Sequence, residues 1–347
     1  NNKKKSITEI VNDYINVRNN EKNAPGKDHE AMEYFVDISR ETEYEEMGGH
    51  VPVGHTRAYV KIQDGCNQFC SYCIIPYVRG RIRSRSQEAI LAEVSELAEA
   101  GIKEVVLTGI HISSYGKDKN NEGALIELIE AISKIKGIKR IRLGSLEPGI
   151  ITEEFVERIS SNSKVCPHFH LSLQSGCDSV LKRMNRKYTC EQYFEKCDML
   201  RKAYKSPALT TDVIVGFPGE TEEDFQETLD VVRRVRYDSA FTFIYSKRTG
   251  TPAAAMEDQV PEDVVKDRFD RLLKEVQDIA AQVVMRDEGT VQKVLVEEMD
   301  THEPGYVTGR LSNNTVVHFQ GDASLIGQIV DVSLDEARGF YFMGTKR

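Results

Sequence analysis

The sequence predicts an α/β protein in which an incomplete TIM-type barrel of six βα units precedes a small antiparallel β-barrel. Six strand-like segments alternate with amphipathic helical segments, and parallel strands need crossover helices of this kind. After about residue 285 the pattern changes to five short alternating stretches with Gly and Asn turns, which is typical of small barrels. We therefore expect an N-terminal segment and linker over 1–55, the βα barrel over 56–285 and the β-barrel over 286–347.

The expected elements follow one another in a regular order. The six strands of the first unit are RAYVKI (57–62), EVVLTG (104–109), RIRLGS (140–145), HFHLSL (168–173), TTDVIVGF (210–217) and AFTFIYS (240–246). Helices between them are expected in SQEAILAEVSELAEA (86–100), EGALIELIEAISKI (122–135) and TEEDFQETLDVVRRV (221–235). The five stretches of the β-barrel are TVQKVLVEE (290–298), GYVTGRL (305–311), TVVHF (315–319), GQIVDVSL (327–334) and GFYFMG (339–344). Reactive residues of βα barrels lie in the loops after the carboxyl ends of the strands, so a site is expected there.

Composition limits the class of protein. The 347 residues are 40% hydrophobic and 29% charged, and no apolar run approaches the roughly 18 residues that a membrane span needs. The first residues carry lysines without a following apolar region, so no secretory signal is expected. We therefore expect a cytoplasmic protein with no membrane partner. The net charge of −9 argues against non-specific nucleic-acid binding, so any contact with RNA is expected to be local.

Three of the seven cysteines lie close together in the first of these loops. Cys66, Cys70 and Cys73 are spaced C-x3-C-x2-C directly after the first strand. An odd number of cysteines with such a cluster argues against a disulfide framework and for ligand or redox use. Protein-held four-iron clusters normally use four thiolates, so three thiolates leave one iron free to bind a substrate or cofactor.

Two other interpretations of this loop are open. The spacing would also place three buried thiols on one face of a helix, but Gly65, Asn67 and Pro76 favour an irregular loop. Zinc would need a fourth ligand, and neither His55 nor His111 is placed as part of a second ligand pair. A [4Fe-4S] cluster with an open iron is the preferred prediction.

Five motifs together resemble the radical S-adenosylmethionine (SAM) methylthiotransferases over about residues 56–347. They are GCNQFCSYCIIPYVRGRIRSR, VVLTGIHISSYG, LGSLEP, HFHLSLQSGCDSVLKRMNRKYT and TDVIVGFPGET. The resemblance implies that the amine and carboxylate of SAM chelate the open iron, and that reductive cleavage of the sulfonium yields methionine and a 5′-deoxyadenosyl radical. The cofactor then carries the difficult chemistry, while the protein binds it, orients it and excludes water.

Two of the motifs indicate a branch of this family. LTGIH…SYG and RGRIRSR look most like the branch that acts on N6-threonylcarbamoyladenosine (t6A) beside the tRNA anticodon, and GYVTGRLSNNTVVHF with IGQIVDVSL is similar to the RNA-binding TRAM domain. The implied activity is sulfur insertion at carbon 2 of that adenine, followed by methylation from a second SAM. The alternatives are a ribosomal-protein or isopentenyladenosine-tRNA methylthiotransferase and, from another class, a non-catalytic metal-containing RNA-binding protein.

The resemblance also predicts partners and a second cofactor. A tRNA and an electron donor such as flavodoxin or ferredoxin are expected partners. Family members usually carry an N-terminal domain whose three further cysteines hold a second [4Fe-4S] cluster, and this sequence has no cysteine before Cys66. Residues 1–55 are therefore expected to be a remnant of that domain and its linker, so that a second cluster would belong only to the part that is missing.

The resemblance and the strand ends together predict the SAM site. Thr108 and Gly109 could bind the SAM amino group through the backbone, Glu147 could meet the ribose or ammonium, and Arg186 could pair with the methionine carboxylate through two parallel N–H donors. For each of them a turn, packing or surface-charge role is the competing interpretation. The full set of expected cofactor-binding residues is Tyr72, Thr108, Gly109, Glu147, Gln174, Arg186, Asp212 and Gly216. No residue beyond the cluster and SAM is expected to be catalytic.

Two groups of basic residues are the expected RNA contacts. Phosphate contacts supply much of the affinity for nucleic acids, so basic residues beside the cysteine loop are the best local candidates, although a solvated run of charge is the alternative. They are Arg79, Arg81, Arg83, Arg85, Lys182, Arg183 and Lys187. Residues 286–347 hold six Lys or Arg against ten Asp or Glu, so the TRAM-like unit is itself acidic.

Overall fold

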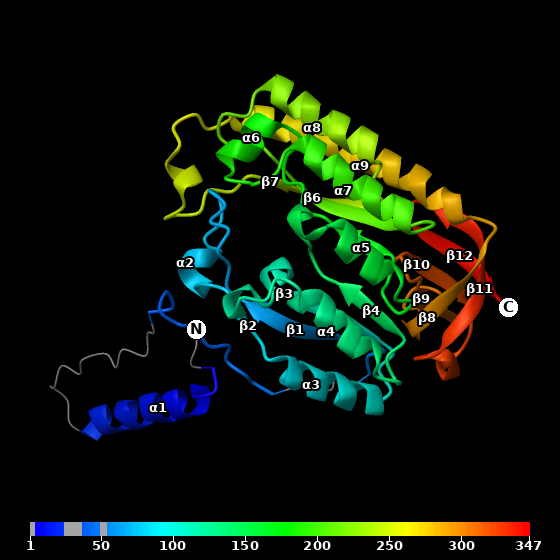
Figure 1. The fold of residues 1–347 in the computed structure, drawn as a ribbon, viewed down its shortest axis with the longest axis horizontal. Coiled ribbons are helices and arrows are strands. Elements are labelled where there is room, and N and C mark those ends of the chain that lie inside the picture. Colours follow the sequence, from blue (N-terminus) through cyan, green and yellow to red (C-terminus); the bar gives the residue numbers. More distant parts are fainter. Residues whose placement is uncertain (1–3, 24–36, 49–53) are drawn as a thin grey trace.

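The computed structural model describes residues 4–23, 37–48 and 54–347 and confirms the predicted fold class (Figure 1). An α/β unit with parallel strands is followed by a closed five-stranded β-barrel. Helix α1 (Ile7–Asn23) lies before both. Among the described residues, no helix is long and apolar enough to cross a membrane.

All six expected strands of the α/β unit are present. They are β1 (Arg57–Asp64), β3 (Glu104–Gly109), β4 (Arg140–Leu143), β5 (His168–His170), β6 (Ala208–Val215) and β7 (Ser239–Ile244). The strands β1, β3 and β4 pair in parallel in one sheet, and β5, β6 and β7 pair in parallel in a second. Isolated parallel bridges from Ile141 to Val165 and from Leu146 to Leu171 join the two sheets. All six carboxyl ends therefore lie at one end of an open barrel.

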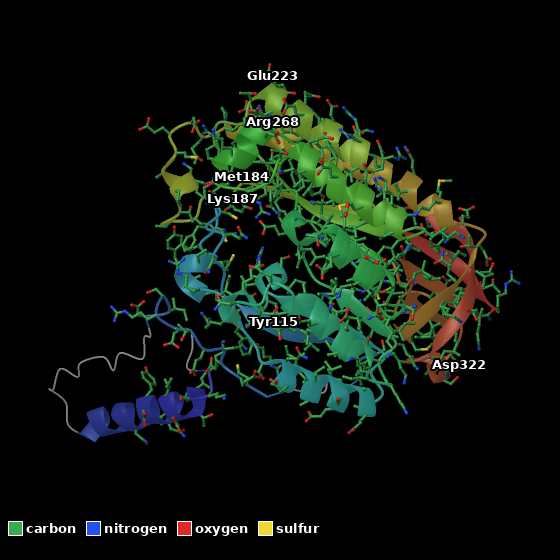
Figure 2. All side chains as sticks on the ribbon, viewed as in Figure 1. Tyr115, Met184, Lys187, Glu223, Arg268 and Asp322 are labelled. Carbon is green, nitrogen blue, oxygen red and sulfur yellow. The ribbon has the colours of Figure 1, made fainter. Side chains whose placement is uncertain are left out.

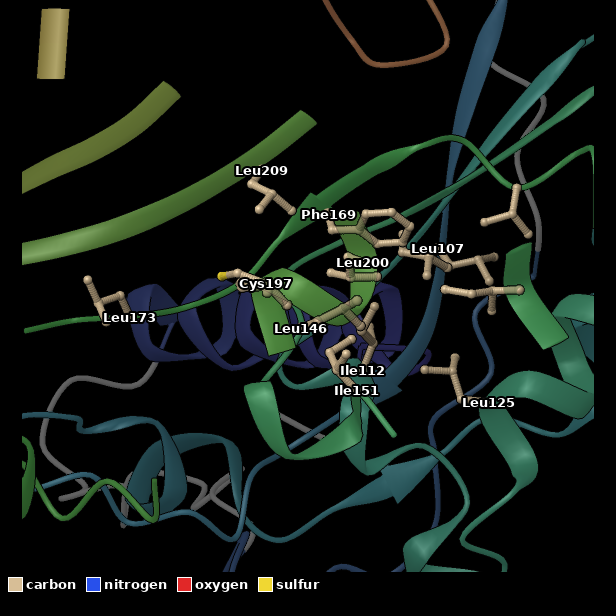
Figure 3. Packing of buried hydrophobic residues seen from close by; sticks show 14 of the residues in the cluster. Leu107, Ile112, Leu125, Leu146, Ile151, Phe169, Leu173, Cys197, Leu200 and Leu209 are labelled. Carbon is tan, nitrogen blue, oxygen red and sulfur yellow. The ribbon is translucent and has the colours of Figure 1, made fainter. Parts of the chain in front are cut away.

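The helices cover the outer face of this barrel, because their apolar residues recur at helical spacing. They are α3 (Gln87–Glu99), α4 (Ala124–Ser133), α5 (Glu153–Ser160), α6 (Asp178–Arg183), α7 (Cys190–Ala203), α8 (Glu222–Val235) and α9 (Glu262–Val284). Thr189 and Thr221 are the N-caps of α7 and α8 and each forms a capping box. In each box the threonine side chain accepts a hydrogen bond from the backbone three residues later, and the side chain of that later residue accepts one from the threonine backbone. Leu107, Phe169 and Leu200 belong to the core formed between strands and helices (Figure 3).

The C-terminal barrel has its own apolar core. Its strands are β8 (Val291–Met299), β9 (Tyr306–Arg310), β10 (Val316–Gln320), β11 (Ile329–Arg338) and β12 (Tyr341–Lys346). Val294, Phe319 and Phe342 are fully buried inside it. One detail differs from the antiparallel barrel that we expected, because β10 pairs with β12 in parallel and this pairing closes the barrel.

A buried carboxylate marks the joint between the two units. Glu104, at the amino end of β3, is 1% exposed and lies among three arginines. Its Oε1 accepts a hydrogen bond from Arg142 Nε at 2.7 Å, and its carboxylate lies 3.7 Å from Arg140 and 3.9 Å from Arg57. Burial opposes ionisation of Glu104, but Arg142, Arg140 and Arg57 together lower its pKa. The carboxylate is therefore charged and holds three guanidinium groups at one end of the barrel.

Two of these arginines reach the C-terminal barrel directly. Arg140 donates to the carbonyl oxygens of Arg310 (2.9 Å) and Lys293 (2.7 Å), and Arg142 donates to that of Ser312 (2.9 Å). These bonds run from β4 to β8, β9 and the turn after β9. The C-terminal barrel is thus attached to the amino ends of the βα strands.

We predict that Glu104→Gln destabilises the protein by about 3–5 kcal/mol at neutral pH, because it leaves buried guanidinium groups without their counter-charge. Because the folded-state pKa of Glu104 is lowered, the stabilisation is present above the unfolded pKa and is lost as pH falls. The difference between wild type and variant should therefore shrink below about pH 4.3, the ordinary glutamate pKa. Chemical denaturation at several pH values measures this.

The matched control is Glu130→Gln, which removes the partner of Arg158 in a pair whose side chains are 40% and 30% exposed. An exposed pair contributes about 0–1 kcal/mol, so this variant should unfold close to wild type. Equal unfolding free energies for Glu104→Gln and wild type would contradict the role assigned to Glu104.

Candidate active site

The loop after β1 carries the three clustered cysteines and is held by backbone contacts. Residues 65–74 contain neither helix nor strand, and the short helix α2 (Ile75–Arg79) follows them. Gly65 has φ +72°, and a Cβ there would lie 1.8 Å from the carbonyl oxygen of Arg81. Gln63 Nε2 donates to the carbonyl oxygens of Asp64 (2.7 Å) and Gly65 (2.6 Å). The chain must therefore turn sharply into the cysteine loop, as the sequence predicted.

Side chains from the ends of several strands line one cavity with these cysteines, which we call the cysteine cavity. Its volume is about 170 Å³. Seven of the predicted metal and cofactor residues line it, namely Cys66, Cys70, Tyr72, Cys73, Glu147, Gln174 and Arg186. The remaining polar side chains include Gln68 and His111. Loops that are far apart in sequence thus meet at the carboxyl end of the barrel.

The donor set of the cysteine cavity fits an iron–sulfur cluster better than a single metal ion. Thiolates are soft ligands, which suit iron–sulfur clusters and zinc. Zinc bonds to thiolates at about 2.3 Å, so its ligands must surround one point closely. Within the part of the chain that the structure describes, no three His, Cys, Asp or Glu side chains form such a group. Iron–sulfur clusters are held by cysteine thiolates, and three cysteines line this one cavity.

The surroundings of the thiols are partly apolar. Burial raises the pKa of Cys66 to about 11 and also raises that of Cys73, so both are protonated thiols without a metal. Arg186 Nη1 lies 3.3 Å from Cys70 Sγ and donates to it. Because metal affinity requires the thiolate form, the positive charge of Arg186 beside Cys70 favours ligation.

Glu147 is the charged acceptor of the cysteine cavity. Gln68 Nε2 donates to its Oε2 at 2.7 Å, His111 Nε2 lies 3.2 Å from the same oxygen, and Arg186 Nη2 lies 3.9 Å from Oε1. Its burial opposes ionisation, but His111 and Arg186 lower the pKa of Glu147 below its ordinary value. The backbone N–H of Glu147 also donates to Ser113 Oγ at 2.9 Å. A fixed carboxylate can accept hydrogen bonds from an ammonium group or a ribose.

Gln174 and Tyr72 form the opposite wall. Gln174 has φ +71°, which is a left-handed conformation that costs free energy for a residue other than glycine. Its backbone bonds to Asp212 and Ile214 of β6 (2.8 and 2.9 Å) hold it there. Tyr72 Oη donates to Gln174 Oε1 at 3.0 Å, and its ring packs edge-on against Phe217. This contact links the cysteine loop to the second sheet.

The other four predicted cofactor residues lie outside the cysteine cavity. At Gly109 a Cβ would lie 2.9 Å from the carbonyl oxygen of Gln63, so a close packing contact explains the glycine. The N–H of Gly216 donates to Glu220 Oε1 at 3.0 Å, and Asp212 Oδ2 lies 3.0 Å from His170 Nε2. Contact of these residues and of Thr108 with a cofactor stays a prediction.

The prediction that all four arginines after the cysteine loop contact RNA is wrong for two of them. Arg83 is 1% exposed, and Arg85 is buried and paired with Glu46 and Glu93. The cause is β2 (Arg83–Ser84), an unexpected strand that pairs antiparallel with the end of β1 and folds this stretch into the protein.

Arg79 and Arg81 lie in different surroundings from Arg83 and Arg85. Arg79 forms an ion pair with Asp64, with Nη2 2.5 Å from Oδ2. Arg81 is exposed, and its guanidinium lies 4.6 Å from the ring centre of Phe69. Of this group, Arg81 is therefore the cation best placed to meet a phosphate.

The second basic group, Lys182, Arg183 and Lys187, also contains both paired and exposed side chains. Arg183 pairs with Asp258 at 2.5 Å and donates to the carbonyl oxygen of Pro218 at 3.0 Å. Lys182 and Lys187 are exposed, and Lys187 lies near Met184 at the α6 end of the barrel (Figure 2). Lys182 and Lys187 remain candidates for RNA contact, and Arg183 mainly holds two loops together.

Sequence reasoning missed two features of this end of the barrel. One is His111, whose Nε2 lies 3.2 Å from Glu147 Oε2 and whose Nδ1 lies 2.5 Å from Ser114 Oγ. Phe241 and Phe243 of β7 are 57% and 49% exposed, and the Phe241 ring lies 5.8 Å from that of His170. The alternation AFTFI could have indicated that one face of this strand stays uncovered.

Parts of this chain match two known protein families, and most of it matches named relatives. Residues 60–232 match the "Radical SAM superfamily", and residues 286–346 match the "TRAM domain". A relative from Lachnoclostridium phytofermentans is 47% identical over 318 residues, which cover 91% of this chain and 70% of the relative. One from Acetivibrio thermocellus is 47% identical over 289 residues, covering 83% of this chain and 60% of the relative. Both are named tRNA-2-methylthio-N(6)-dimethylallyladenosine synthase.

A solved structure matches part of the chain at low identity. Coproporphyrinogen III oxidase from Escherichia coli, described as a radical SAM enzyme, is 16% identical with a TM-score of 0.48. The match covers 74% of this chain and 67% of that protein.

We predict that replacing any one of Cys66, Cys70 or Cys73 by Ala removes most bound iron and labile sulfide after anaerobic reconstitution, because each thiolate holds one iron. Cys190→Ala is the control, since this partly exposed cysteine lies outside the cysteine cavity. Iron and sulfide per chain and the visible absorbance measure the result. Full iron and sulfide content in all three variants would contradict the assignment.

Proposed function

Because this chain belongs to the family of radical SAM tRNA methylthiotransferases, we propose that it attaches a methylthio group to carbon 2 of N6-dimethylallyladenosine in tRNA. The observation that carries the proposal is the cysteine cavity, in which three thiols share one space with Glu147 and Arg186. The chain spans 60–70% of the length of the relatives described above.

The relatives correct the expected substrate. The motifs LTGIH…SYG and RGRIRSR led to the t6A branch, whereas the relatives at 45–47% identity are named for N6-dimethylallyladenosine. This is the isopentenyladenosine alternative of the sequence analysis. Of the residues in these two motifs, only Ile110 and His111 line the cysteine cavity, and neither motif belongs to β7.

The exposed face of β7 supports the dimethylallyl substrate. A dimethylallyl group is an apolar five-carbon chain, whereas a threonylcarbamoyl group carries a carboxylate. Phe241 and Phe243, which lie on the same face of β7, are 57% and 49% exposed, and Ile214 is the partner of Phe243 on β6. Transfer of apolar groups from water to such a surface is favourable by about 0.8 kcal/mol per CH₂. Uncovered aromatic rings also offer stacking surfaces to an unpaired base.

The residues of the cysteine cavity have separate tasks in this proposal. Cys66, Cys70 and Cys73 would hold the cluster, which when bound supplies the electron that breaks a carbon–sulfur bond of SAM. Arg186 presents a guanidinium beside Cys70 and so favours anionic ligands, including the carboxylate of the methionine part. Glu147 accepts hydrogen bonds from the ammonium or ribose. A second cluster and a reductant such as flavodoxin or ferredoxin stay predictions.

We predict that the reconstituted chain, with dithionite and SAM under anaerobic conditions, releases 5′-deoxyadenosine. With tRNA that carries N6-dimethylallyladenosine and a sulfur source, the 2-methylthio nucleoside should form, as measured by mass spectrometry of digested tRNA. Transcript tRNA without the prenyl group is the control. Formation of the methylthio product on t6A-containing tRNA instead, or no 5′-deoxyadenosine from loaded protein, would overturn the proposal.

We predict that Phe243→Ala raises KM for prenylated tRNA about tenfold or more, because burial of a Phe side chain against the substrate contributes about 1.5–3 kcal/mol. The preference for prenylated over unprenylated tRNA should fall by a similar factor. Phe340→Ala removes a 76% exposed ring from the C-terminal barrel and is the control. An unchanged preference in the Phe243 variant would exclude β7 from prenyl recognition.

A further inference from the structure

A second cavity lies between the amino ends of the βα strands and the C-terminal barrel, and we call it the junction cleft. Its volume is about 660 Å³. Lys103, Lys139 and Lys164 line it from the loops before β3, β4 and β5, Arg140 lines it from the first position of β4, and Lys293 lines it from β8. None of its thirteen described lining residues carries a carboxylate. Asp331 pairs with Lys293 and Glu104 lies 3.7 Å from Arg140, so the uncompensated positive charge of the cleft comes from the three lysines of the βα barrel.

Some cations of the junction cleft already bind other groups of the protein, and others do not. Arg140 is bound to Glu104 and to carbonyl oxygens of the C-terminal barrel. Lys164 donates to the carbonyl oxygen of Ile135 at 2.8 Å, and its pKa is lowered by burial and by neighbouring Lys139. Among the described residues, the structure gives the ammonium groups of Lys103 and Lys139 no hydrogen bond or ion pair. Two cations are therefore free to bind an anion.

The junction cleft and the cysteine cavity lie at opposite ends of β3. Lys103 precedes β3, and Ile110, which lines the cysteine cavity, follows it. Seven residues of extended chain at roughly 3.3 Å each separate the two sites by about 23 Å. An RNA whose modified base enters the cysteine cavity would reach the cleft only with a distant part of its backbone.

We infer that the junction cleft binds the phosphate backbone of tRNA at a point outside the stem-loop that carries the modified adenosine. This inference rests on the proposed function, since it takes tRNA as the substrate. It also accounts for the acidic composition of residues 286–347, because the βα barrel supplies most of the cations at the seam. Lysines that contact phosphate without reading bases position an RNA rather than select its sequence.

The test compares two RNAs and two double variants by equilibrium binding. The RNAs are full-length tRNA with N6-dimethylallyladenosine and a stem-loop cut from it, with a stem too short to reach the cleft. Lys103→Ala/Lys139→Ala should weaken binding of full-length tRNA roughly tenfold and reduce the slope of log K against log salt by about 2, one per lost contact. Binding of the stem-loop should not change.

The control Lys202→Ala/Lys266→Ala removes the same charge from exposed positions on α7 and α9. It should leave both affinities as in wild type, and Lys103→Arg/Lys139→Arg should retain tRNA binding. Equal weakening by the control variant, or an equal loss for the stem-loop, would overturn the inference, as would unchanged binding by the alanine variant. Thermal unfolding of the alanine variant should match wild type, because neither lysine supports another residue.

Two further outcomes separate this inference from its alternatives. Polyglutamate of matched charge is tested as a competitor of tRNA binding. If it displaces bound tRNA as effectively as unlabelled tRNA does, the cleft fits an acidic protein and the inference fails. Methylthiolation of full-length tRNA with N6-dimethylallyladenosine by wild type is measured on the same preparations. Absence of product there would overturn the proposed function, whereas unchanged tRNA binding by the alanine variant would overturn the cleft alone.

Discussion

The buried charge cluster around Glu104 is the contact on which the arrangement of the two units depends. One carboxylate holds Arg57, Arg140 and Arg142, and the last two bond to the backbone of the C-terminal barrel. Desolvation of four charged groups is costly, so the cluster is better understood as determining geometry than as adding much net stability. Removal of one member would nevertheless leave the others uncompensated. The amino ends of the strands are covered as a result, and the carboxyl ends stay open.

This polarity places two different chemistries at the two ends of the same strands. The carboxyl end gathers the thiols with Glu147 and Arg186, whereas the amino end gathers Lys103 and Lys139. In Figure 1 the C-terminal barrel accordingly lies at the side of the molecule away from α2. A chain of net charge −9 repels RNA at long range, so local cation clusters must supply the attraction.

The parts of the candidate site that could be predicted are those that a strand end determines. The cysteine spacing is local, and Glu147 and Gln174 follow β4 and β5, whose carboxyl ends meet at one place in any parallel barrel. Arg83 and Arg85 failed as RNA contacts because their surroundings come from β1 and from acidic residues far along the chain. The N6 substituent was also assigned wrongly, because neither motif used for that assignment belongs to β7, where the uncovered aromatic side chains lie.

The sequence by itself determined the order and type of the elements, because periodicity of apolar residues and spacing of thiols are properties of adjacent positions. It also determined the fold class, since six strands with crossover helices have few ways to pack. The tertiary structure alone decided the parallel closure of β10 on β12, the approach of His111 to Glu147, and the junction cleft between two units. Each of these features depends on which distant segments come into contact. Contacts that bury charged or polar groups form only where partners compensate the cost of burial, and those partners come together only in the folded chain.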